Sequence, residues 1–452
     1  MRKNELSSFR DPSGSIYYKK SKVFRRINPS YFQQYRKLID SGLYNKLESE
    51  GLIIKHKEIE KSKKFITIQP AKIPYISYPY EWSFSQIKDA ALMTLKIQSI
   101  ALEHGMLLKD ASVYNIQFIG SKAIFIDTLS FEFYKEGSSW VAYRQFCQHF
   151  LAPMALMSYK DIHLNFLYKN YVDGIPLSFA SRLLPKKTYL NFSMLSNIHL
   201  HARSQKQMAD KKVNYAKYNM TKHRMTSLVK SLEGAIRALK IKNIRTEWEK
   251  YYSFTNYSTK AFKDKHATVE KLVRKTKAKT ILDMGANTGE FLKSLGSSTT
   301  YGVACDIDPL AIESGYIKAK NDKSNNLLHL VLDITNPSPS IGWANKERLS
   351  FAERYSVDCV MALALVHHLA ISNNLRFDMI ASFFSELGKY LIIEFVPKED
   401  SKTKILLQNR EDVFDHYNQG GFEEVFKKYF NIVSKKKIVE TKRTIYLMEK
   451  IK

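Results

Sequence analysis

Aspartate and glycine residues follow a short apolar run in the C-terminal half of the chain, in the pattern Asp-x-Gly-x-x-x-Gly. The pattern is formed by Asp283, Gly285 and Gly289. Glycine has no Cβ, so the backbone can turn sharply here and a ligand can lie directly against it. The spacing lacks the third glycine of the dinucleotide fingerprint and the Gly-Lys-Ser/Thr ending of a P-loop. It predicts a loop that holds a nucleoside cofactor.

Further carboxylates stand where the next two apolar runs end. Asp306 lies about 20 residues past the glycine loop, where a carboxylate at a strand end can accept hydrogen bonds from both hydroxyls of a ribose. Asp306 fits the strand end better, and Asp308 is the nearby alternative. The following run ends at Asp333, which precedes Ile334. These spacings predict a row of acidic residues along one edge of a sheet.

Two histidines, His367 and His368, follow the fourth apolar run. Because active sites of open α/β sheets lie beyond the carboxyl ends of the strands, these imidazoles are expected to enter the site. Either one is a candidate general base for a hydroxyl, since imidazole titrates near neutral pH. Glu394, near the end of the fifth run, is expected to bind the substrate or to support a histidine.

The elements that must position these residues alternate between strands and helices. Short buried apolar runs separated by helical periodicity favour a parallel sheet, and two strands at the end of the chain favour a closing antiparallel hairpin. We therefore predict an α/β fold with a Rossmann-like seven-stranded sheet. Its strands are expected at 280–282, 301–306, 328–332, 357–365, 390–400, 431–439 and 443–448.

This arrangement resembles the class I S-adenosylmethionine-dependent methyltransferases. The resemblance implies that S-adenosylmethionine is the cofactor and that the first acidic residue and the glycine loop bind its methionine end. It also implies that the second acidic residue binds the ribose and that the third faces the adenine amino group. The residues so implied are Asp283, Gly285, Ala286, Asn287, Gly289, Asp306, Asp308, Asp333 and Ile334, with Tyr257 and Lys265 from the approach segment.

A second group of polar residues lies in the N-terminal half. A long helix is followed by Asp110 and Asn115, a tight hairpin and an apolar strand that ends at Asp127. This order resembles the catalytic lobe of protein kinases and aminoglycoside-type phosphotransferases, where the first Asp handles the substrate hydroxyl and the other two residues hold magnesium.

Several kinase features are missing from this half of the chain. No His precedes Asp110, no Phe-Gly follows Asp127, and no early strand carries Ala-x-Lys. We expect an α+β, kinase-like domain that does not transfer phosphate, and no metal site apart from these weak candidates. The alternative is a helical domain in which the same residues cap turns.

The charge of the chain is concentrated between these two regions. The chain has 452 residues and a net charge of +27. Residues 201–300 hold 22 Lys and Arg against 8 Asp and Glu, whereas residues 301–400 hold 9 against 13. We predict domains at 1–210 and 259–452, joined by a basic helical linker at 211–258. Such a segment can bind nucleic acid, which makes an RNA methyltransferase one alternative, or it can be a solvated helical face.

The remaining composition bounds the class of protein. An apolar fraction of 44% can bury enough surface to rule out a disordered chain. Three dispersed cysteines give neither a disulfide framework nor a zinc site. The N-terminus has no apolar signal region, and no run of 18 uncharged apolar residues occurs, so we expect a soluble cytoplasmic protein without a transmembrane segment.

A closer likeness rests on three segments. Residues 362–369 (Ala-Leu-Ala-Leu-Val-His-His-Leu), 394–400 (Glu-Phe-Val-Pro-Lys-Glu-Asp) and 9–14 (Phe-Arg-Asp-Pro-Ser-Gly) resemble a bacterial group of two-part methyltransferases that includes a rhizobial nodulation protein. The resemblance implies O-methyl transfer to a glycan, a polymer precursor or another small acceptor. A non-catalytic nucleotide-binding scaffold is the alternative of another class.

Overall fold

The chain folds into two compact units, which are described separately. The computed structural model describes residues 3–20, 22–203, 220–241, 258–295, 301–408 and 411–451. Unit 1 comprises Met1–Ile244 and Ile341–Arg348, and unit 2 comprises Arg245–Ser340 and Leu349–Lys452. Tyr257 and most of the segment expected as a linker lie outside the described residues.

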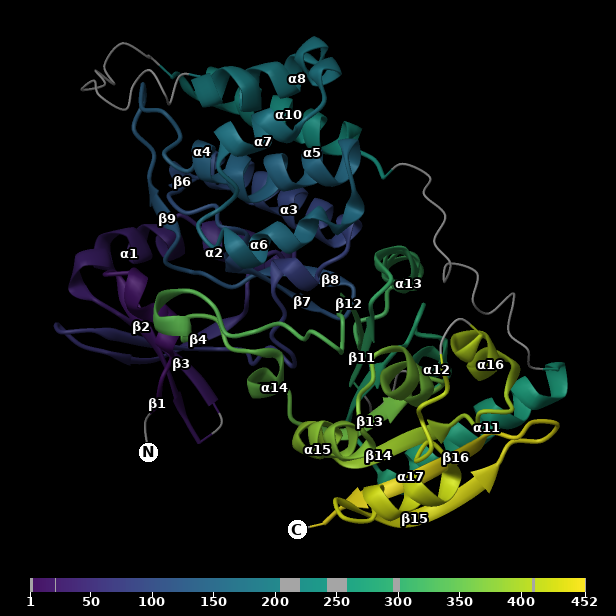
Figure 1. Cartoon of the computed structure of the whole chain (residues 1–452). Helices are drawn as coiled ribbons and strands as arrows, with labels where there is room; N and C mark the ends of the chain where they lie inside the picture. The colour runs from purple at the N-terminus through teal and green to yellow at the C-terminus, as the bar shows by residue number, and fades with distance from the viewer. Residues whose placement is uncertain are drawn as a thin grey trace. The chain divides into compact units, whose positions relative to one another are not determined.

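Unit 2 is built on a seven-stranded sheet with the strand order β12-β11-β10-β13-β14-β16-β15 (Figure 1). Neighbouring strands from β12 to β14 are parallel, and β16 runs antiparallel to both β14 and β15. This topology confirms the predicted Rossmann-like sheet. The strands are β10 (Thr280–Met284), β11 (Tyr301–Asp306), β12 (Leu327–Val331), β13 (Val357–Ala362), β14 (Gly388–Phe395), β15 (Phe430–Lys437) and β16 (Thr444–Lys450).

The strand order places the functional edge of the sheet at β10. The chain runs from β10 to β11 and β12 on one side and then returns to β13 on the other, so β10 lies at the topological switch point. All residues of β12 and nearly all of β10 are buried, as expected for parallel strands covered on both faces. The carboxyl ends of β10, β11, β13 and β14 therefore meet beside the glycine loop.

Helices connect and cover these strands. Val269, Leu272 and Val273 of α11 pack into one apolar cluster with Ile281 of β10 and Cys359 of β13. The periodic apolar face of α11 thus fixes the helix that leads to the glycine loop. The helices of unit 2 are α11 (Thr259–Thr276), α12 (Glu290–Ser294), α13 (Pro309–Asn321), α14 (Phe351–Arg354), η12 (His368–Ser372), α15 (Phe377–Leu387), α16 (Ser401–Leu407) and α17 (Gln419–Phe426).

Unit 1 begins with a five-stranded antiparallel sheet in the order β1-β2-β3-β5-β4. Two short helices, α1 (Phe32–Asp40) and α2 (Leu43–Ser49), lie between β3 and β4 in the sequence. The predicted N-terminal hairpin is present as β2 and β3. The strands are β1 (Lys3–Asn4), β2 (Gly14–Lys19), β3 (Lys22–Ile27), β4 (His56–Lys61) and β5 (Ile66–Pro70).

The second part of unit 1 has the element order of a kinase catalytic lobe. The long buried helix α3 (Phe84–Glu103) leads to β6 (Met106–Leu108), which pairs with β9 (Phe131–Phe133). Between them lies the hairpin of β7 (Ile116–Ile119) and β8 (Lys122–Phe125). The long helix, the hairpin and the strand pair around Asp110, Asn115 and Asp127 thus occur in the order expected from the sequence.

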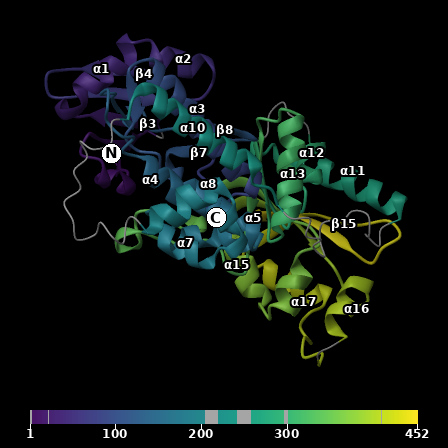
Figure 2. The ribbon, with the colours of Figure 1, turned by 90° about the horizontal axis from the view of Figure 1, so that it is seen from above.

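The rest of unit 1 is helical. Figure 2 shows α4, α5, α7 and α8 gathered in one part of the unit. Short helical segments connect and extend them, and several are 3₁₀ or π turns instead of regular α-helix. The helical segments are α4 (Tyr143–Phe146), η5 (Cys147–Leu151), α5 (Ala152–Tyr159), η6 (Ile162–Phe166), α6 (Leu167–Asn170), α7 (Leu177–Leu183), η7 (Lys186–Leu190), α8 (Phe192–Met194), η8 (Leu195–Leu200) and α10 (Lys222–Ala238).

Helix α10 belongs to unit 1, although we expected its residues in a linker. It packs against α3, and Lys88 Nζ donates hydrogen bonds of 2.8 and 2.7 Å to the carbonyl oxygens of Arg237 and Leu239. The sequence did not reveal that α10 packs in unit 1, because its buried residues are interspersed with many basic ones. The buried residues are Met225, Val229, Leu232, Ala235 and Ile236. The described part of the chain has no helix long and apolar enough to cross a membrane.

Residues 341–348 also belong to unit 1, although they follow β12 in the sequence. Arg10 Nε lies 2.7 Å from the buried Glu347 carboxylate, and Arg348 lies over the ring of Tyr114 at 4.5 Å. This excursion of the chain was not apparent from the sequence, because its local pattern resembles any polar loop of an α/β domain.

A buried tyrosine hydroxyl gives a stability test for unit 1. Tyr31 Oη accepts a hydrogen bond from the Phe131 N–H at 3.0 Å and donates one to the Phe131 carbonyl at 2.6 Å. We expect Tyr31→Phe to lower the free energy of unfolding by about 1–3 kcal/mol, because both backbone groups lose their partner. Urea denaturation measures the change. Exposed Tyr189→Phe should change it little, and equal midpoints for the two variants would contradict the assignment.

Candidate functional site

The loop after β10 turns through three residues with positive φ. Gly285 has φ +77°, Asn287 has +51° and Gly289 has +80°. A Cβ on Gly289 would lie 3.0 Å from His329 Nε2, and one on Gly285 would lie 3.4 Å from Leu365. Glycine is thus required at Gly289 by both backbone and packing, while Gly285 leaves room for a ligand at the mouth of the loop. The sequence pattern identified both positions.

Asp283 is a buried carboxylate at the end of β10 with one oxygen unpaired. It is 2% exposed, and its Oδ2 atom has no hydrogen-bond partner among the described residues. Burial raises the pKa of Asp283 to about 7; the charge of Asp306 adds to the rise, and Lys265 opposes it. An unpaired buried acceptor is costly, so this atom fits the ammonium group of a ligand.

Asp306 and Asp308 have different roles. Asp306 accepts hydrogen bonds from the backbone N–H groups of Asn287 at 2.8 Å and Asp308 at 2.9 Å, so its carboxylate ties the glycine loop to β11. Burial raises the pKa of Asp306 to about 6. Asp308 instead caps α13 through the N–H groups of Leu310 and Ala311. Asp306 lines the cavity described next and Asp308 does not, which favours the first of the two predicted ribose ligands.

A cavity of about 250 Å³ collects most of the predicted cofactor residues. Asp333 and Ile334 line it after β12, and the Asp333 carboxylate accepts hydrogen bonds from Thr335 N at 2.8 Å and Oγ1 at 2.6 Å. Gly289 does not line the cavity. The predicted residues that do are Asp283, Gly285, Ala286, Asn287, Asp306, Asp333, Ile334, Lys265 and His368.

The two histidines separate into a lining residue and a packing residue. His368 lines the cavity, whereas His367 does not and is only 2% exposed. The ring centroids of the two histidines are 4.2 Å apart. Burial lowers the pKa of His368, and the charges of Arg443 and Lys402 lower it further. Burial holds the pKa of His367 well below its ordinary value. Both are therefore neutral near pH 7, and only His368 faces the cavity.

Glu394 is engaged in a buried charge network. Its Oε2 atom lies 2.6 Å from Lys265 Nζ, and its Oε1 atom lies 3.6 Å from Arg443, whose guanidinium also pairs with Asp400 at 2.7 Å. Glu394 is fully buried and does not line the cavity. The prediction that Glu394 contacts the substrate or supports a histidine therefore gives way to a structural ion pair beside the site.

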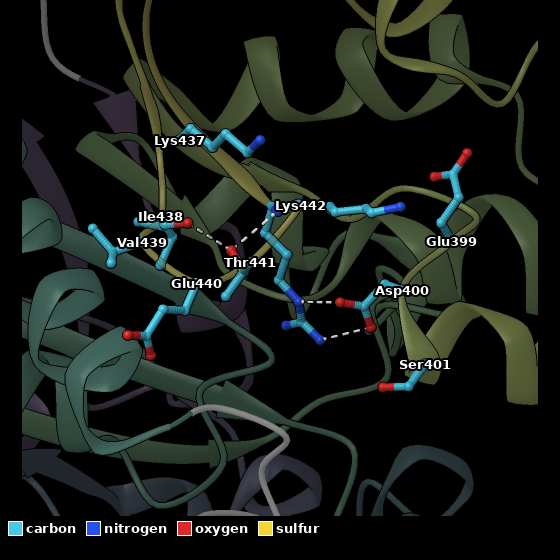
Figure 3. A pocket seen from close by; sticks show the side chains of 10 residues that line it. Glu399, Asp400, Ser401, Lys437, Ile438, Val439, Glu440, Thr441 and Lys442 are labelled. Carbon is cyan, nitrogen blue, oxygen red and sulfur yellow. Dashed lines mark hydrogen bonds and ion pairs between the residues drawn. The ribbon is translucent and has the colours of Figure 1, made fainter.

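A second cavity lies at the same edge of the sheet, between the β15–β16 loop and the start of α16. Its volume is about 660 Å³, and its walls hold charges of both signs and hydroxyl groups. Figure 3 shows Asp400 paired with the arginine from the hairpin loop, beside Thr441 and Lys442. Arg443 lines this cavity and Lys265 lines the first, so the charge network joins the walls of both.

Several lining residues were not found from the sequence. Phe262 comes from α11, and Leu363, Ala364 and Leu365 come from the turn after β13. Ala364 has φ +51°, a conformation that is uncommon for a residue with a Cβ. Such backbone strain marks functional loops, but no residue type in the sequence reveals it.

The three kinase-like candidates do lie together in unit 1. Asn115 Nδ2 donates to Ser130 Oγ at 3.2 Å, and Ser130 Oγ donates to the Asp127 carboxylate at 2.5 Å. Asp110 accepts hydrogen bonds from Ser112 N and Gln145 Nε2. Burial raises the pKa of Asp110, and the charge of Asp127 adds to the effect.

Arg25 on β3 is the residue of this group that sequence reasoning missed. Its guanidinium forms an ion pair with the Asp127 carboxylate. Burial opposes ionisation of Asp127, but the charge of Arg25 and the hydrogen bonds from Ser130, Arg25 and Leu129 N together lower the pKa of Asp127. Arg26, the next residue, lies instead over the Phe65 ring at 4.5 Å. Strand alternation, which decides between the two arginines, was the available signal.

The pKa of Asp283 leads to a pH prediction for cofactor binding. Because its pKa is raised to about 7, Asp283 is protonated below that pH and charged above it. We expect the affinity for S-adenosylmethionine, whose methionine end carries an ammonium, to fall up to about tenfold per pH unit from pH 7 to 6 and to level off above pH 8. Calorimetric titration at several pH values measures it. Asp283→Asn should bind more weakly and remove this slope; an unchanged slope contradicts the role.

The buried ion pair gives a second prediction. We expect Glu394→Gln to reduce the free energy of unfolding by about 3–5 kcal/mol, because it leaves the Lys265 charge buried without its partner. The double variant Lys265→Met/Glu394→Leu should recover a large part of this loss, since no buried charge of the pair remains. Chemical denaturation tests both. A double variant less stable than Glu394→Gln would contradict the explanation that the loss comes from the unpaired charge of Lys265.

Comparison with known proteins gives the family. No protein-family model matches the chain. The chain is 32% identical to nodulation protein NoeA of Rhizobium meliloti (strain 1021) over 456 residues, which cover 98% of this chain and 95% of NoeA.

Solved structures with similarity to part of the chain include three methyltransferases. N-methyltransferase NodS from Bradyrhizobium japonicum WM9 has a TM-score of 0.32 and 10% identity, and covers 43% of this chain and 99% of its own. Magnesium protoporphyrin IX methyltransferase (ChlM) from Synechocystis PCC 6803, with bound SAH, has a TM-score of 0.33 and 16% identity. The match covers 45% of this chain and 92% of ChlM. The bifunctional kinase-methyltransferase WbdD has a TM-score of 0.28 and 16% identity, and the match covers 42% of this chain and 39% of WbdD.

These TM-scores are low, so the fold of unit 2 follows from its own strand order and glycine loop. The relationship to NoeA, in contrast, extends over nearly the whole of both chains. The chain therefore belongs to the family of the rhizobial nodulation protein NoeA, and by the fold and site of unit 2 it is a class I S-adenosylmethionine-dependent methyltransferase.

Proposed function

We propose that the protein transfers a methyl group from S-adenosylmethionine to a hydroxyl oxygen of a glycan or a polymer precursor. One observation carries the proposal: the same cavity is lined by the unpaired carboxylate of Asp283, by Asp306 and by the neutral imidazole of His368. Residues suited to hold a cofactor and a proton acceptor thus line one cavity. The name of NoeA, a nodulation protein, is compatible with a glycan acceptor but does not specify one.

The residues of the cavity fit the cofactor. S-adenosylmethionine supplies a methyl group on a positively charged sulfur. Asp283 would hold the ammonium of its methionine end, Asp306 would hold the ribose hydroxyls, and Asp333 with Ile334 would hold the adenine. Phe262 and Leu365 line the same cavity and exclude water from it. The chain's main contribution is alignment of the acceptor oxygen with the methyl group.

His368 would remove the proton of the acceptor hydroxyl. Its imidazole lines the cavity and is neutral near pH 7, because burial and the neighbouring charges of Arg443 and Lys402 lower its pKa. The imidazole would take the hydroxyl proton as the oxygen accepts the methyl group, whose bond to sulfur would break and leave a neutral thioether; the proton would then pass to solvent. His367 would support this ring by packing against it.

The second cavity would hold a more distant part of the acceptor. It is larger than the first, it opens at the same carboxyl edge, and Lys437, Lys442 and Glu399 give it charges of both signs. Hydroxyl and carbonyl groups of a sugar chain can bond to such a wall, since it offers both donors and acceptors. We therefore favour an extended, polar acceptor.

The direct test is methyl transfer from labelled S-adenosylmethionine to fractions of an extract from a strain that lacks the gene. We expect label in a polysaccharide or glycolipid fraction with wild type and none with Gly285→Arg, which fills the mouth of the loop. Gly234→Arg on α10, where a Cβ meets no atom within 4 Å, is the matched control. Label in RNA would support the RNA alternative, and retained cofactor binding without any labelled fraction would support the scaffold.

His368→Gln tests the base. We expect kcat to fall by about 10²- to 10⁴-fold with little change in the Kd for S-adenosylmethionine, because the side chain acts on the acceptor proton. In wild type, kcat at saturating substrates should decline only below pH 6.5, the ordinary imidazole value, since the pKa of His368 is lowered. Exposed His416→Gln is the control. Wild-type kcat in His368→Gln would remove His368 from the mechanism.

A further inference from the structure

An exposed apolar surface covers one corner of unit 1. It lies on α7, η7, α8 and η8, which pack against one another, and α10 packs against α8. We call this surface the apolar corner and define it by Leu183, Tyr189, Leu190, Phe192 and Leu200.

The side chains of the apolar corner are unusually open to solvent. Leu190 is 91% exposed, Phe192 is 78% and Leu200 is 47%. Single exposed apolar residues are common on proteins, but several large ones close together in sequence indicate an interaction site. Leu190 and Phe192 are separated by one residue, so both tips belong to the same turn.

Side-chain hydrogen bonds of buried and neighbouring residues hold the turn that carries Leu190 and Phe192. Buried His199 is bonded to Ser181 Oγ at 2.7 Å through Nδ1 and to Thr188 Oγ1 at 2.9 Å through Nε2. The Asn191 side chain accepts a hydrogen bond from Met194 N at 3.1 Å. The tips of Leu190 and Phe192 are therefore held outward by a fixed framework, because the polar groups beneath them are satisfied.

The charge around the apolar corner has one sign. Residues 174–203 contain Arg182, Lys186, Lys187 and Arg203 and no Asp or Glu. All four basic residues are exposed, and Arg203 lies 5.9 Å from the Tyr189 ring centroid. On the neighbouring α10 the single acidic residue, Glu233, is already paired with Arg237 at 2.7 Å. Within residues 174–203 and α10, basic side chains therefore outnumber acidic ones beside the exposed Leu and Phe tips.

We propose that the apolar corner docks the protein on an anionic lipid surface, with Leu190 and Phe192 entering the headgroup layer and the four basic residues facing lipid phosphates. Basic side chains beside an anionic leaflet add attraction one by one, and apolar tips add burial. A soluble protein partner would have to be rich in carboxylates to match the same surface, whereas a phosphate-rich leaflet matches it over its whole extent. The proposal is independent of the methyl-transfer assignment.

Sedimentation of the full chain with lipid vesicles tests the proposal. We expect binding to vesicles of phosphatidylcholine mixed with phosphatidylglycerol, weaker binding at high salt, and little binding to phosphatidylcholine alone. Lys186→Glu/Lys187→Glu and Leu190→Ser/Phe192→Ser should each lower the partition coefficient about tenfold or more.

Matched variants elsewhere on unit 1 separate local docking from overall charge. Lys63→Glu/Lys64→Glu changes the net charge by the same amount at another exposed lysine pair, and Ile59→Ser removes another exposed apolar side chain. Both should bind vesicles about as well as wild type. Equal losses for Lys63→Glu/Lys64→Glu and Lys186→Glu/Lys187→Glu would overturn the proposal, since attraction would then follow total charge alone.

Fluorescence gives an independent measurement of insertion. Phe192→Trp should shift its emission to the blue with phosphatidylglycerol vesicles, while Ile59→Trp should not, because only the first side chain enters the headgroup layer. Sedimentation analysis without lipid tests whether a second copy of the chain binds the apolar corner instead. Self-association that Leu190→Ser/Phe192→Ser abolishes, without vesicle binding by wild type, would show an interface between two copies and overturn the membrane assignment.

Discussion

The cost of burying charge governs the carboxyl edge of unit 2. Lys265, Glu394 and Arg443 have side chains no more than 4% exposed. Glu394 pairs with both cations, and Asp400 also pairs with Arg443, so each buried charge has a partner of opposite sign. The resulting network ties α11 to β14, to the start of β16 and to the start of α16. Asp283, whose Oδ2 has no hydrogen-bond partner among the described residues, lies beside this network on the cavity wall.

The same constraint shapes the kinase-like part of unit 1. In kinases the last Asp of the motif works with a metal ion, which neutralises phosphate charge. Here Arg25 occupies the neighbourhood of Asp127 with a fixed positive charge and keeps that carboxylate ionised. Ser130 then links Asp127 to Asn115. An internal cation, Arg25, thus pairs with the carboxylate that the kinase resemblance suggests as a metal ligand.

The two units therefore differ in how they treat their polar groups. Unit 2 keeps an unpaired carboxylate and a neutral imidazole in one cavity, which is the arrangement expected of a reacting site. In unit 1 the kinase-like residues Asp110, Asn115 and Asp127 all have partners within the unit. Unit 1 also exposes the apolar corner together with the basic residues near it, the surface for which we propose docking on lipid.

The sequence predicted the sheet of unit 2 because parallel strands and their turns have strong local signatures. Gly285 and Gly289 were identifiable for the same reason, since their backbone conformations are nearly exclusive to glycine. The choice between Asp306 and Asp308 could not be made from local sequence, because the two residues are only two positions apart. Asp306 ties the glycine loop to β11, whereas Asp308 caps α13. The placement of α10 and residues 341–348 in unit 1 was equally hidden from local pattern.

By itself the sequence determined the strands of the seven-stranded sheet, the glycine loop and the acidic strand ends, because these follow from periodicity and residue type over short distances. Only the tertiary structure decided which histidine faces the cavity, that Glu394 is bound to Lys265, and that Asp127 is paired with an arginine of β3. The physical reason is that burial and pairing of charge depend on partners far away in the chain; Lys265 and Glu394 are 129 residues apart.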